Sequence, residues 1–305
     1  MEFAELQPDL QKWIRDAVRN GQQLTVMVDA LLKAGYQPSI EHAVRQYISD
    51  PEINLREGQG ASLRKDAFDG VQGVQGDGLC DDGSRFRLFE PVSNRIKLGD
   101  RQVDILLSMR QPNVILFGNL LADWECDALI EMSRPQMAPS RVVNSENGAY
   151  DLRDVRTSFG TYFKTRETPL VAAIEARISH LLGVPESRGE PLQILHYQPG
   201  AEYRPHYDFF NPEHPGNSRV LSMGGQRMGT VIMYLNDVVS GGSTVFPRLN
   251  LDILPRKGCG LFFSYANDQG DLDYQTLHGG SPVLEGEKWI ATKWLRLGDF
   301  VGRSE

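Results

Sequence analysis

The stretch LHYQPGAEYRPHYDFF, from Leu195 to Phe210, sets a histidine two residues before an aspartate within a run of aromatic side chains. The whole chain of 305 residues has only six histidines. Residues two apart on a β-strand point to the same face, so His206 and Asp208 are expected to converge on one point. That point is either a metal ion or an ordinary hydrogen-bonded pair, because the His-x-Asp pattern alone allows both.

A second histidine and a lysine follow in LHGGSPVLEGEKW, where His278 precedes two glycines and Lys288 opens an apolar segment. Even spacing on a strand places four residues on one face: Lys288, Ile290, Thr292 and Trp294. A lysine at a solvated sheet edge is one interpretation, whereas an ammonium that points inward needs an anion. Two imidazoles and one carboxylate are the ligands that leave positions open on iron(II) in non-haem oxygenases.

The composition is that of a soluble globular protein, with 40% hydrophobic and 24% charged residues. A net charge of -8 argues against nucleic acid and anionic membranes as partners, since both are bound by excess Lys and Arg. We expect no membrane span and no secretory signal, because no apolar run is long enough and the first residues are acidic. The three cysteines form no CxxC pair, which favours a cytoplasmic location.

The pattern of apolar residues divides the chain into three parts. Residues 1–50 are expected to form a helical unit, with helices over 10–18, 24–34 and 40–48. Residues 51–110 are expected to form a Gly-rich linker and a hairpin that turns at Gly99 and Asp100. Residues 111–300 are expected to form an α+β domain, in which helices over 124–132 and 169–182 pack outside a mostly antiparallel β-structure.

Several motifs, taken in order and spacing, resemble the prolyl 4-hydroxylase branch of the Fe(II) and 2-oxoglutarate dependent dioxygenases, with the collagen and plant enzymes and their bacterial counterparts. They are VRTSFGTYF (155–163), the opening stretch (195–210), QRMGTVIMYLND (226–237), GGSTVFP (241–247), and His278 with Lys288. The resemblance spans roughly residues 111–298. It implies a double-stranded β-helix, or jelly roll, which agrees with the run of short strands.

The resemblance also implies a set of site residues. His206, Asp208 and His278 would hold Fe(II), and 2-oxoglutarate and O2 would fill the remaining positions. Lys288 would pair with the C5 carboxylate of 2-oxoglutarate, helped by the hydroxyls of Tyr197 and Thr244. The implied reaction couples decarboxylation of 2-oxoglutarate to succinate and CO2 with hydroxylation of a C–H bond, with ascorbate as a further cofactor of the family.

Peptidyl proline in a protein or peptide is the substrate that the resemblance implies. The residues that match its peptide contacts are Arg156, Ser158, Glu190, Arg227 and Trp294. Two polar, Gly-bearing segments are expected to be mobile and to close over a bound peptide: 150–157 and 211–226. Ser243 stands where the family usually has Glu, so the peptide groove is expected to differ.

Other interpretations of the sequence stay open. The same chemistry on a non-proline residue or a small molecule is one. A cupin-like metal hydrolase that uses the same three ligands is another, although a hydrolase has no need of a buried lysine. A non-catalytic binding module is a third. Residues 1–110 carry no ligand cluster and are expected to recruit substrate or to mediate oligomerisation, and the oligomeric state does not follow from the sequence.

Overall fold

The computed structural model describes residues 3, 6, 10, 11, 14, 24–33, 37–49, 80, 81, 85, 86, 91, 93–140, 142, 143, 150, 151, 156–212, 214–265 and 272–302. The chain divides into two compact units, Met1–Val71 and Gln72–Glu305. The expected linker over 51–79 lies outside the described residues, so that prediction is not tested.

The first unit is helical, as expected. Helix α2 spans Leu24–Lys33 and helix α3 spans Ile40–Ser49. The expected helix over 10–18 is helical at the three positions that the structure describes: 10, 11 and 14. Buried apolar side chains of this unit form one cluster, in which the rings of Phe3 and Tyr47 stack with centroids 4.4 Å apart. The unit therefore has a hydrophobic core of its own.

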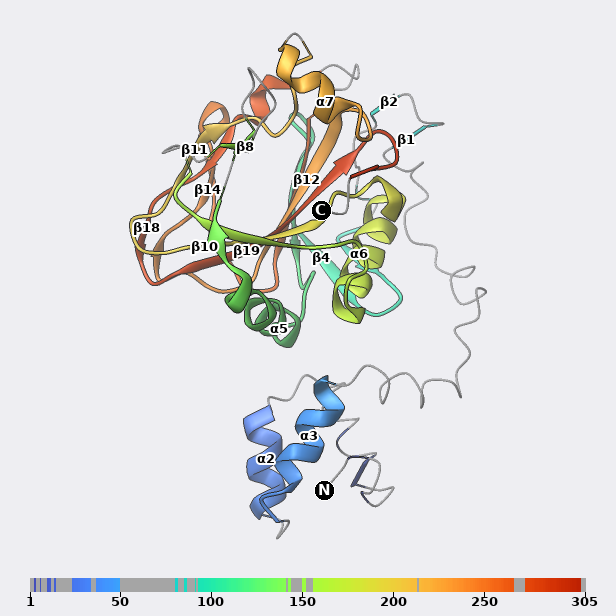
Figure 1. The fold of residues 1–305 in the computed structure, drawn as a ribbon, viewed down its shortest axis with the longest axis vertical. Coiled ribbons are helices and arrows are strands. Elements are labelled where there is room, and N and C mark those ends of the chain that lie inside the picture. Colours follow the sequence, from blue (N-terminus) through green and yellow to red (C-terminus); the bar gives the residue numbers. More distant parts are fainter. Residues whose placement is uncertain are drawn as a thin grey trace. The chain divides into compact units, whose positions relative to one another are not determined.

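The second unit is built on a large antiparallel sheet, the major sheet (Figure 1). Its strands are, in spatial order, β3 (Arg95–Lys97), β4 (Gln102–Met109), β5 (Val114–Gly118), β16 (Gly260–Ser264), β12 (Arg227–Tyr234), β19 (Lys288–Arg296), β10 (Leu192–Tyr197), β9 (Phe159–Phe163) and β6 (Ala138–Pro139). The central strand β19 is buried at every position, because it has neighbours on both edges and packed layers on both faces.

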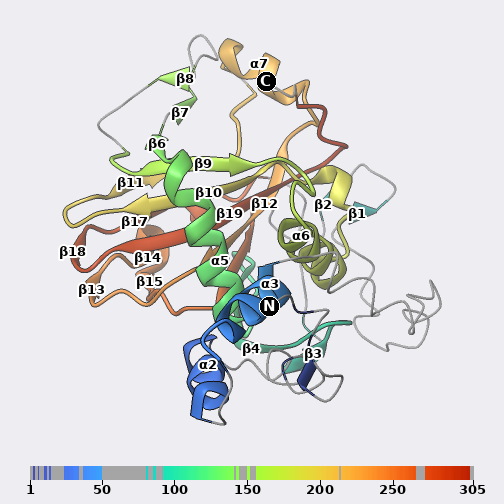
Figure 2. The same cartoon turned by 60° about the horizontal axis from the view of Figure 1, so that its bottom comes forward.

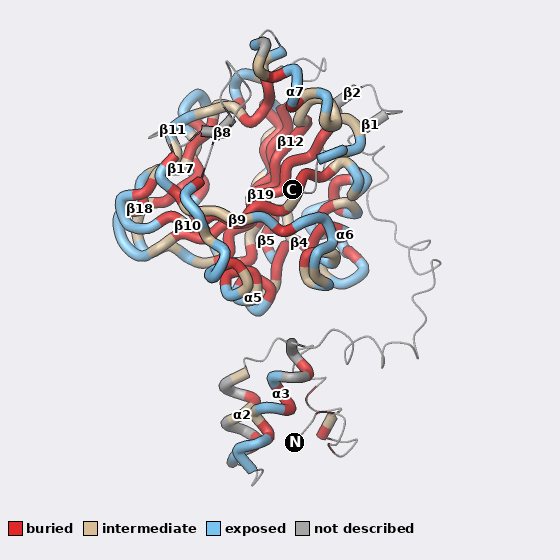
Figure 3. Tube along the Cα trace, viewed as in Figure 1, coloured by how far each residue is buried: buried red, intermediate tan, exposed pale blue. Residues whose placement is uncertain are grey.

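A minor sheet covers one face of the major sheet. Its order is β11 (Tyr203–His206), β17 (His278–Gly280), β14 (Thr244–Phe246) and β15 (Leu251–Ile253). Three two-stranded ribbons complete the described strands: β1 (Cys80–Asp81) with β2 (Arg85–Phe86), β7 (Val142–Val143) with β8 (Tyr150–Asp151), and β13 (Ser240–Gly241) with β18 (Val283–Glu285). Apolar side chains from the two sheets form a shared core. In Figure 3 the strands β12 and β19 of the major sheet are coloured mainly as buried. The arrangement is the jelly roll that the sequence predicted.

Two helices cover the outer face of the major sheet, α5 (Asp123–Ser133) and α6 (Pro169–Leu182), as Figure 2 shows. Helix α6 ends as predicted at Gly183, whose φ of 66° is easy for glycine. The N-cap of α5 is Ala122 rather than the expected Asp123, and the Glu125 carboxylate accepts the Ala122 N–H at 2.7 Å. A short helix, α7 (Ser218–Leu221), follows β11. Among the described residues, no helix has both the length and the apolar character to cross a membrane.

The hairpin at Gly99 and Asp100 is formed as predicted, and Leu98 N–H donates to Arg101 O at 2.7 Å across the turn. Its second strand, β4, pairs with β5 along most of its length. The pattern of apolar residues predicts this hairpin as part of a region that precedes the domain, residues 51–110. The pairing extends the major sheet through it, so the second unit begins well before residue 111.

Candidate metal and co-substrate site

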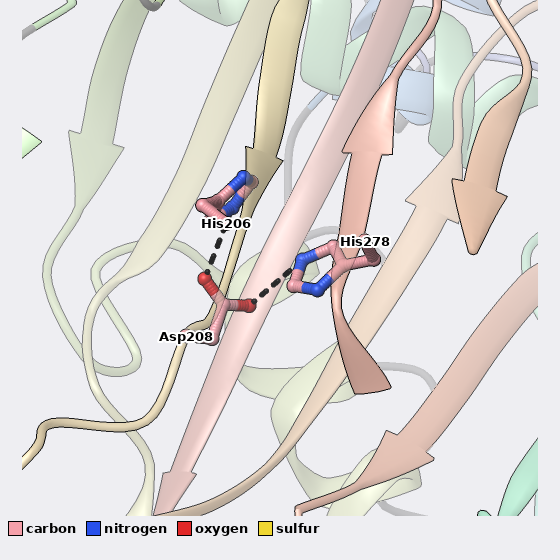
Figure 4. A group of neighbouring side chains, drawn as sticks. All are labelled: His206, Asp208 and His278. Carbon is pink, nitrogen blue, oxygen red and sulfur yellow. Dashed lines mark ion pairs between the residues drawn. The ribbon is translucent and has the colours of Figure 1, made fainter. Parts of the chain in front are cut away.

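His206, Asp208 and His278 converge at one end of the minor sheet, as the sequence predicted (Figure 4). His206 ends β11, Asp208 lies in the bend that follows, and His278 begins β17. The two histidines face each other as a register pair of these strands. The Asp208 carboxylate lies between them, with Oδ1 3.5 Å from His206 Nε2 and Oδ2 3.5 Å from His278 Nε2.

Backbone carbonyls orient both imidazoles. His206 Nδ1 lies 2.9 Å from Arg204 O, and His278 Nδ1 lies 3.0 Å from Thr276 O. Each Nδ1 therefore carries the proton and donates it, which leaves the lone pair of each Nε2 directed toward the carboxylate. Burial lowers the pKa of His206, which favours the neutral imidazole that binds metals.

The Asp208 carboxylate is held from the major sheet by two hydroxyls. Thr230 Oγ1 donates to Oδ2 at 2.7 Å and Tyr265 OH donates to the same oxygen at 3.0 Å. These two hydroxyls also contact each other. Burial acts to raise the pKa of Asp208, but the charge and hydrogen bonds of His278 and His206, when these imidazoles are protonated, outweigh burial and hold the pKa well below its usual value. Asp208 is therefore an ionised, oriented carboxylate that could bind a metal ion.

A pocket with about 410 Å³ of empty volume opens beside the three ligand side chains. The four residues that strand spacing placed on one face of β19 all line it: Lys288, Ile290, Thr292 and Trp294. Lys288 is 3% exposed, and among the residues that the structure describes no carboxylate lies within 4.0 Å of its Nζ. Burial lowers the pKa of Lys288 to about 7. An ammonium so placed is costly unless an anion joins it.

The surroundings of Lys288 leave room for that anion. Tyr197 faces Lys288 across the β10–β19 pair, and Nζ lies 5.5 Å from its ring centroid. Thr244 also lines the pocket, so both predicted helpers lie in one lining with Lys288, and their contact with a ligand stays a prediction. At Gly280, an added Cβ would lie 3.8 Å from Nζ, so the missing side chain keeps this end of the pocket open.

Tyr234 is a residue of this region that the sequence analysis missed. Its hydroxyl donates to Thr244 Oγ1 at 2.9 Å, and its ring centroid lies 6.0 Å from Lys288 Nζ. In the sequence it stands within the apolar run GTVIMYLN, where a buried tyrosine is ordinary core. Only its alternation with Ile232, which lines the pocket, could have indicated a role on this face.

Three of the predicted substrate residues lie at or next to the pocket. Arg156 and Trp294 line it. The Arg156 guanidinium stacks 4.8 Å from the Tyr203 ring centroid and donates to Ser158 Oγ at 3.2 Å and to Gln193 Oε1 at 3.1 Å. Ser158 is buried behind Arg156 rather than in the pocket lining. Arg156 is thus oriented by neutral groups.

The other two predicted substrate residues, Glu190 and Arg227, are not part of the pocket lining. They form an ion pair with Arg227 Nε 2.7 Å and Nη2 2.9 Å from the two carboxylate oxygens. Arg227 stacks on Trp294, with its guanidinium carbon 4.0 Å from the ring centroid. Their contact with substrate stays a prediction.

The two segments expected to close over a peptide are described only in part. Residues 152–155 and 213 lie outside the described residues. Within the second segment, residues 215–217 form a 3-10 turn and α7 follows directly. Part of this segment is therefore regular structure, and its mobility stays a prediction.

The residues present fit an iron ion and a dicarboxylate. Two neutral imidazoles and one carboxylate offer three ligand atoms within 4.8 Å of one another. This set suits a divalent iron with further positions for other ligands. The cation that a distal carboxylate requires stands in the same pocket, unpaired within the described structure.

Comparison with known proteins agrees with this chemistry. Residues 192–296 match the family model described as the 2OG-Fe(II) oxygenase superfamily. The chain is 38% identical over 223 residues to "Probable prolyl 4-hydroxylase 3" of Arabidopsis thaliana, covering 67% of this chain and 75% of that protein. It is 38% identical over 221 residues to "Prolyl 4-hydroxylase 5" of the same organism, covering 66% and 74%.

Solved structures were also compared. The viral collagen prolyl hydroxylase from Paramecium Bursaria Chlorella virus-1, as its 2OG complex, aligns with a TM-score of 0.48 and 29% identity. The alignment covers 60% of this chain and 95% of that one.

Proposed function

This chain belongs to the 2OG-Fe(II) oxygenase superfamily, and we propose from that premise that it is a prolyl 4-hydroxylase acting on peptidyl proline. Iron(II), 2-oxoglutarate and O2, when bound, supply the oxidising chemistry: 2-oxoglutarate loses CO2 to become succinate, which takes one oxygen atom, and the substrate C–H bond takes the other. The protein binds and orients these reactants and limits the access of water.

The observation that carries the proposal is Lys288. A metal hydrolase built on the same three ligands has no use for a buried ammonium on the pocket wall, whereas 2-oxoglutarate brings a second carboxylate that needs one. The lysine and the ligands His206, Asp208 and His278 line a single pocket, so a short dicarboxylate can reach both. All three ligand residues are present. A domain retained only for binding would be expected to have lost at least one of them.

Each residue of the site then has a task. The Nε2 atoms of His206 and His278 and the Asp208 carboxylate would hold the iron. Thr230 and Tyr265 fix the orientation of that carboxylate by donating to Oδ2. These hydrogen bonds reduce the freedom of Asp208 before the metal arrives.

At the other end of the pocket, Lys288 would pair with the C5 carboxylate of 2-oxoglutarate. Thr244 and Tyr197 lie within the same lining and would add hydroxyl donors. Tyr234 donates to Thr244 and so directs the Thr244 hydroxyl hydrogen into the remaining space.

Peptidyl proline is the preferred substrate because the relatives that share 38% identity are named prolyl 4-hydroxylases. Arg156 would contact a peptide carbonyl, and this role is supported by its place in the pocket lining and by the absence of a carboxylate partner among the described residues. Trp294 would form the pocket wall that contacts the substrate proline ring. Ser158 would act by holding Arg156.

Three finer features belong to the same proposal. Ascorbate would restore iron(II) after turnovers that do not hydroxylate substrate, as the family resemblance implies. The net charge of -8 supports a protein or peptide partner over nucleic acid or an anionic membrane surface. The sparse cysteines support action in the reducing cytoplasm.

The direct test is succinate release from 2-oxoglutarate with iron(II), O2 and a panel of proline-containing peptides, with product mass followed for the gain of one oxygen atom. We expect peptide-dependent succinate release and hydroxylation at proline. Succinate release that no peptide stimulates would support a different substrate with the same chemistry. Full activity with zinc in place of iron would support the hydrolase interpretation instead.

A further inference from the structure

Glu190 is a buried carboxylate shared by two arginines. Arg227 binds it with Nε and Nη2, and Arg296 Nε donates to Oε1 at 2.6 Å. Glu190 is 7% exposed and Arg296 is 2% exposed. One carboxylate thus fixes two guanidinium groups, each of which has further donors directed elsewhere.

Arg296 directs its further donor to the segment after β11. Its Nη1 donates to Val220 O at 3.1 Å and to Gly225 O at 2.6 Å. The end of the same segment also pairs with the chain beyond β19, where Gly298 N–H donates to Gly224 O at 2.9 Å. Arg296 therefore ties residues 220–225 to Glu190.

Arg227 directs its further donor to the metal site. Its Nη1 donates to the backbone carbonyl of Asp208 at 3.2 Å. Both guanidinium groups also stack on Phe210, with the Arg227 and Arg296 carbons 4.8 Å and 5.0 Å from its ring centroid. The Gln226 side chain binds the backbone of Phe210 on both sides, accepting its N–H at 2.8 Å and donating to its carbonyl at 2.6 Å.

We propose that Arg296 is a positioning residue, which through Glu190 and Arg227 couples the 220–225 segment to the backbone of the metal ligand Asp208. The proposal rests on the proposed function in taking Asp208 as a ligand. Arg296 itself is not among the residues that line the pocket. Arg296 fixes the Glu190 carboxylate by a hydrogen bond. Glu190 in turn holds Arg227 in contact with the Asp208 carbonyl and the Trp294 ring.

The coupling explains why three charged side chains, Glu190, Arg227 and Arg296, are packed together with little exposure to solvent. A carboxylate and two arginines carry a large desolvation cost, which an apolar cluster would avoid. Hydrogen bonds with fixed direction, however, can hold three backbone carbonyls of two separate segments at defined distances: those of Asp208, Val220 and Gly225. Apolar contacts lack that directionality.

The outer face of the major sheet offers a matched control. Arg177 is also buried, at 5% exposure, and binds Glu125 with two donors and the Leu120 carbonyl with Nη1 at 2.9 Å. It contacts neither the 220–225 segment nor Asp208. Arg177→Met should therefore lower the free energy of unfolding as Arg296→Met does, but it should leave exchange in residues 218–226 and Co(II) binding unchanged.

The experiment loads the full chain with Co(II) in place of iron and compares the parent with Arg296→Met, Arg296→Lys and Arg177→Met. Hydrogen exchange of residues 218–226 and the visible absorption of bound Co(II) are measured under conditions where each variant is folded. In both Arg296 variants, we expect exchange in this segment to be about ten- to a hundredfold faster, the loss expected for one hydrogen bond from a charged donor. We expect Co(II) affinity to fall by about tenfold with an altered spectrum.

Arg296→Lys keeps the inference testable if Arg296→Met does not fold. A single ammonium retains the charge beside Glu190 but cannot reach the carboxylate and both carbonyls together. The inference is overturned if Arg296→Lys leaves both segment exchange and Co(II) binding unchanged, or if Arg177→Met alters them equally. A parent that does not bind Co(II) at all would instead overturn the proposed function.

Discussion

Strand β19 carries one buried lysine on each face, and the two differ in what surrounds them. Lys293, on the outer face, is 2% exposed and lies 2.5 Å from the Glu175 carboxylate of α6. Lys288, on the inner face, is 3% exposed and has no carboxylate partner within the described part of the chain. The protein supplies the anion for Lys293, and under the proposed function the C5 carboxylate of 2-oxoglutarate would supply the anion for Lys288. We expect the unpaired buried charge to indicate a ligand-binding site and the paired one to have a structural role.

The largest effect is expected on the outer face. Lys293→Met leaves the Glu175 carboxylate buried without its cation, although Arg166 N–H still donates to it at 2.7 Å. The free energy of unfolding should fall by about 3–5 kcal/mol, measured by urea denaturation. The double variant Lys293→Met with Glu175→Leu should recover most of that loss. If Lys293→Met were as stable as the parent, the Lys293–Glu175 ion pair would not stabilise the fold, and the contrast with the unpaired Lys288 would be wrong.

The same substitution on the inner face should have the opposite sign. Lys288→Met removes a buried charge that has no partner, so without 2-oxoglutarate the free energy of unfolding should rise by about 1–4 kcal/mol at neutral pH. The pKa of Lys288 is lowered in the folded protein to about 7, so between pH 7 and 10.5 the unfolded chain binds more protons at this residue. The contribution of Lys288 to stability therefore improves as pH rises through this range.

The gain from Lys288→Met should accordingly be largest below pH 7 and shrink toward pH 10. Thermal or urea unfolding of parent and variant at several pH values measures the difference. A gain that grows with pH, or a clear loss of stability at pH 6, would mean that Lys288 has an anionic partner within the protein.

The affinity for 2-oxoglutarate should depend on pH for the same reason. Below pH 7 Lys288 is already charged, but above pH 7 binding must add a proton, so affinity should fall by about tenfold per pH unit, or about 1.4 kcal/mol. Calorimetry with metal-loaded protein measures this slope. The control ligand is 2-oxopentanoate, which keeps the metal-binding end and lacks the C5 carboxylate, and its affinity should lack the slope. Equal slopes for both ligands would assign the pH dependence to the metal end.

The smallest effect is expected from the hydroxyls beside Lys288. Thr244→Val removes one neutral donor and should weaken 2-oxoglutarate binding by about two- to tenfold. Tyr234→Phe should have a smaller effect, since Tyr234 orients Thr244 rather than contacting the ligand. A loss with Thr244→Val as large as that with a Lys288 variant would contradict the leading role of the charge.

The sequence predicted the parts of this site that local spacing determines. His206 and Asp208 stand two residues apart, and the alternation of β19 placed Lys288 and Trp294 on one face, which the pocket confirms. The resemblance to the family added His278 as the third ligand. Helix α6 was also predicted to its ends, because Pro169 and Gly183 determine them locally.

What the sequence did not predict depends on contacts between distant residues. Tyr265 and Thr230 hold the Asp208 carboxylate from strands that lie far from it in the chain. Arg296 and Glu190 form their hydrogen bond although they lie 106 residues apart in the chain. The predicted domain start at residue 111 was wrong for the same reason. The pairing of β4 with β5 makes the preceding hairpin part of the second unit.

The most direct test of the account is anaerobic calorimetry of 2-oxoglutarate against metal-loaded parent, Lys288→Ala, Lys288→Arg and the double variant Lys293→Met with Glu175→Leu. Lys288→Ala should bind at least about a hundredfold more weakly while still binding metal, and Lys288→Arg should keep part of the affinity. The double variant should bind as the parent does, because its charges lie on the other face. If Lys288→Ala bound 2-oxoglutarate as tightly as the parent, the unpaired lysine would not mark the co-substrate site and the central claim would be wrong.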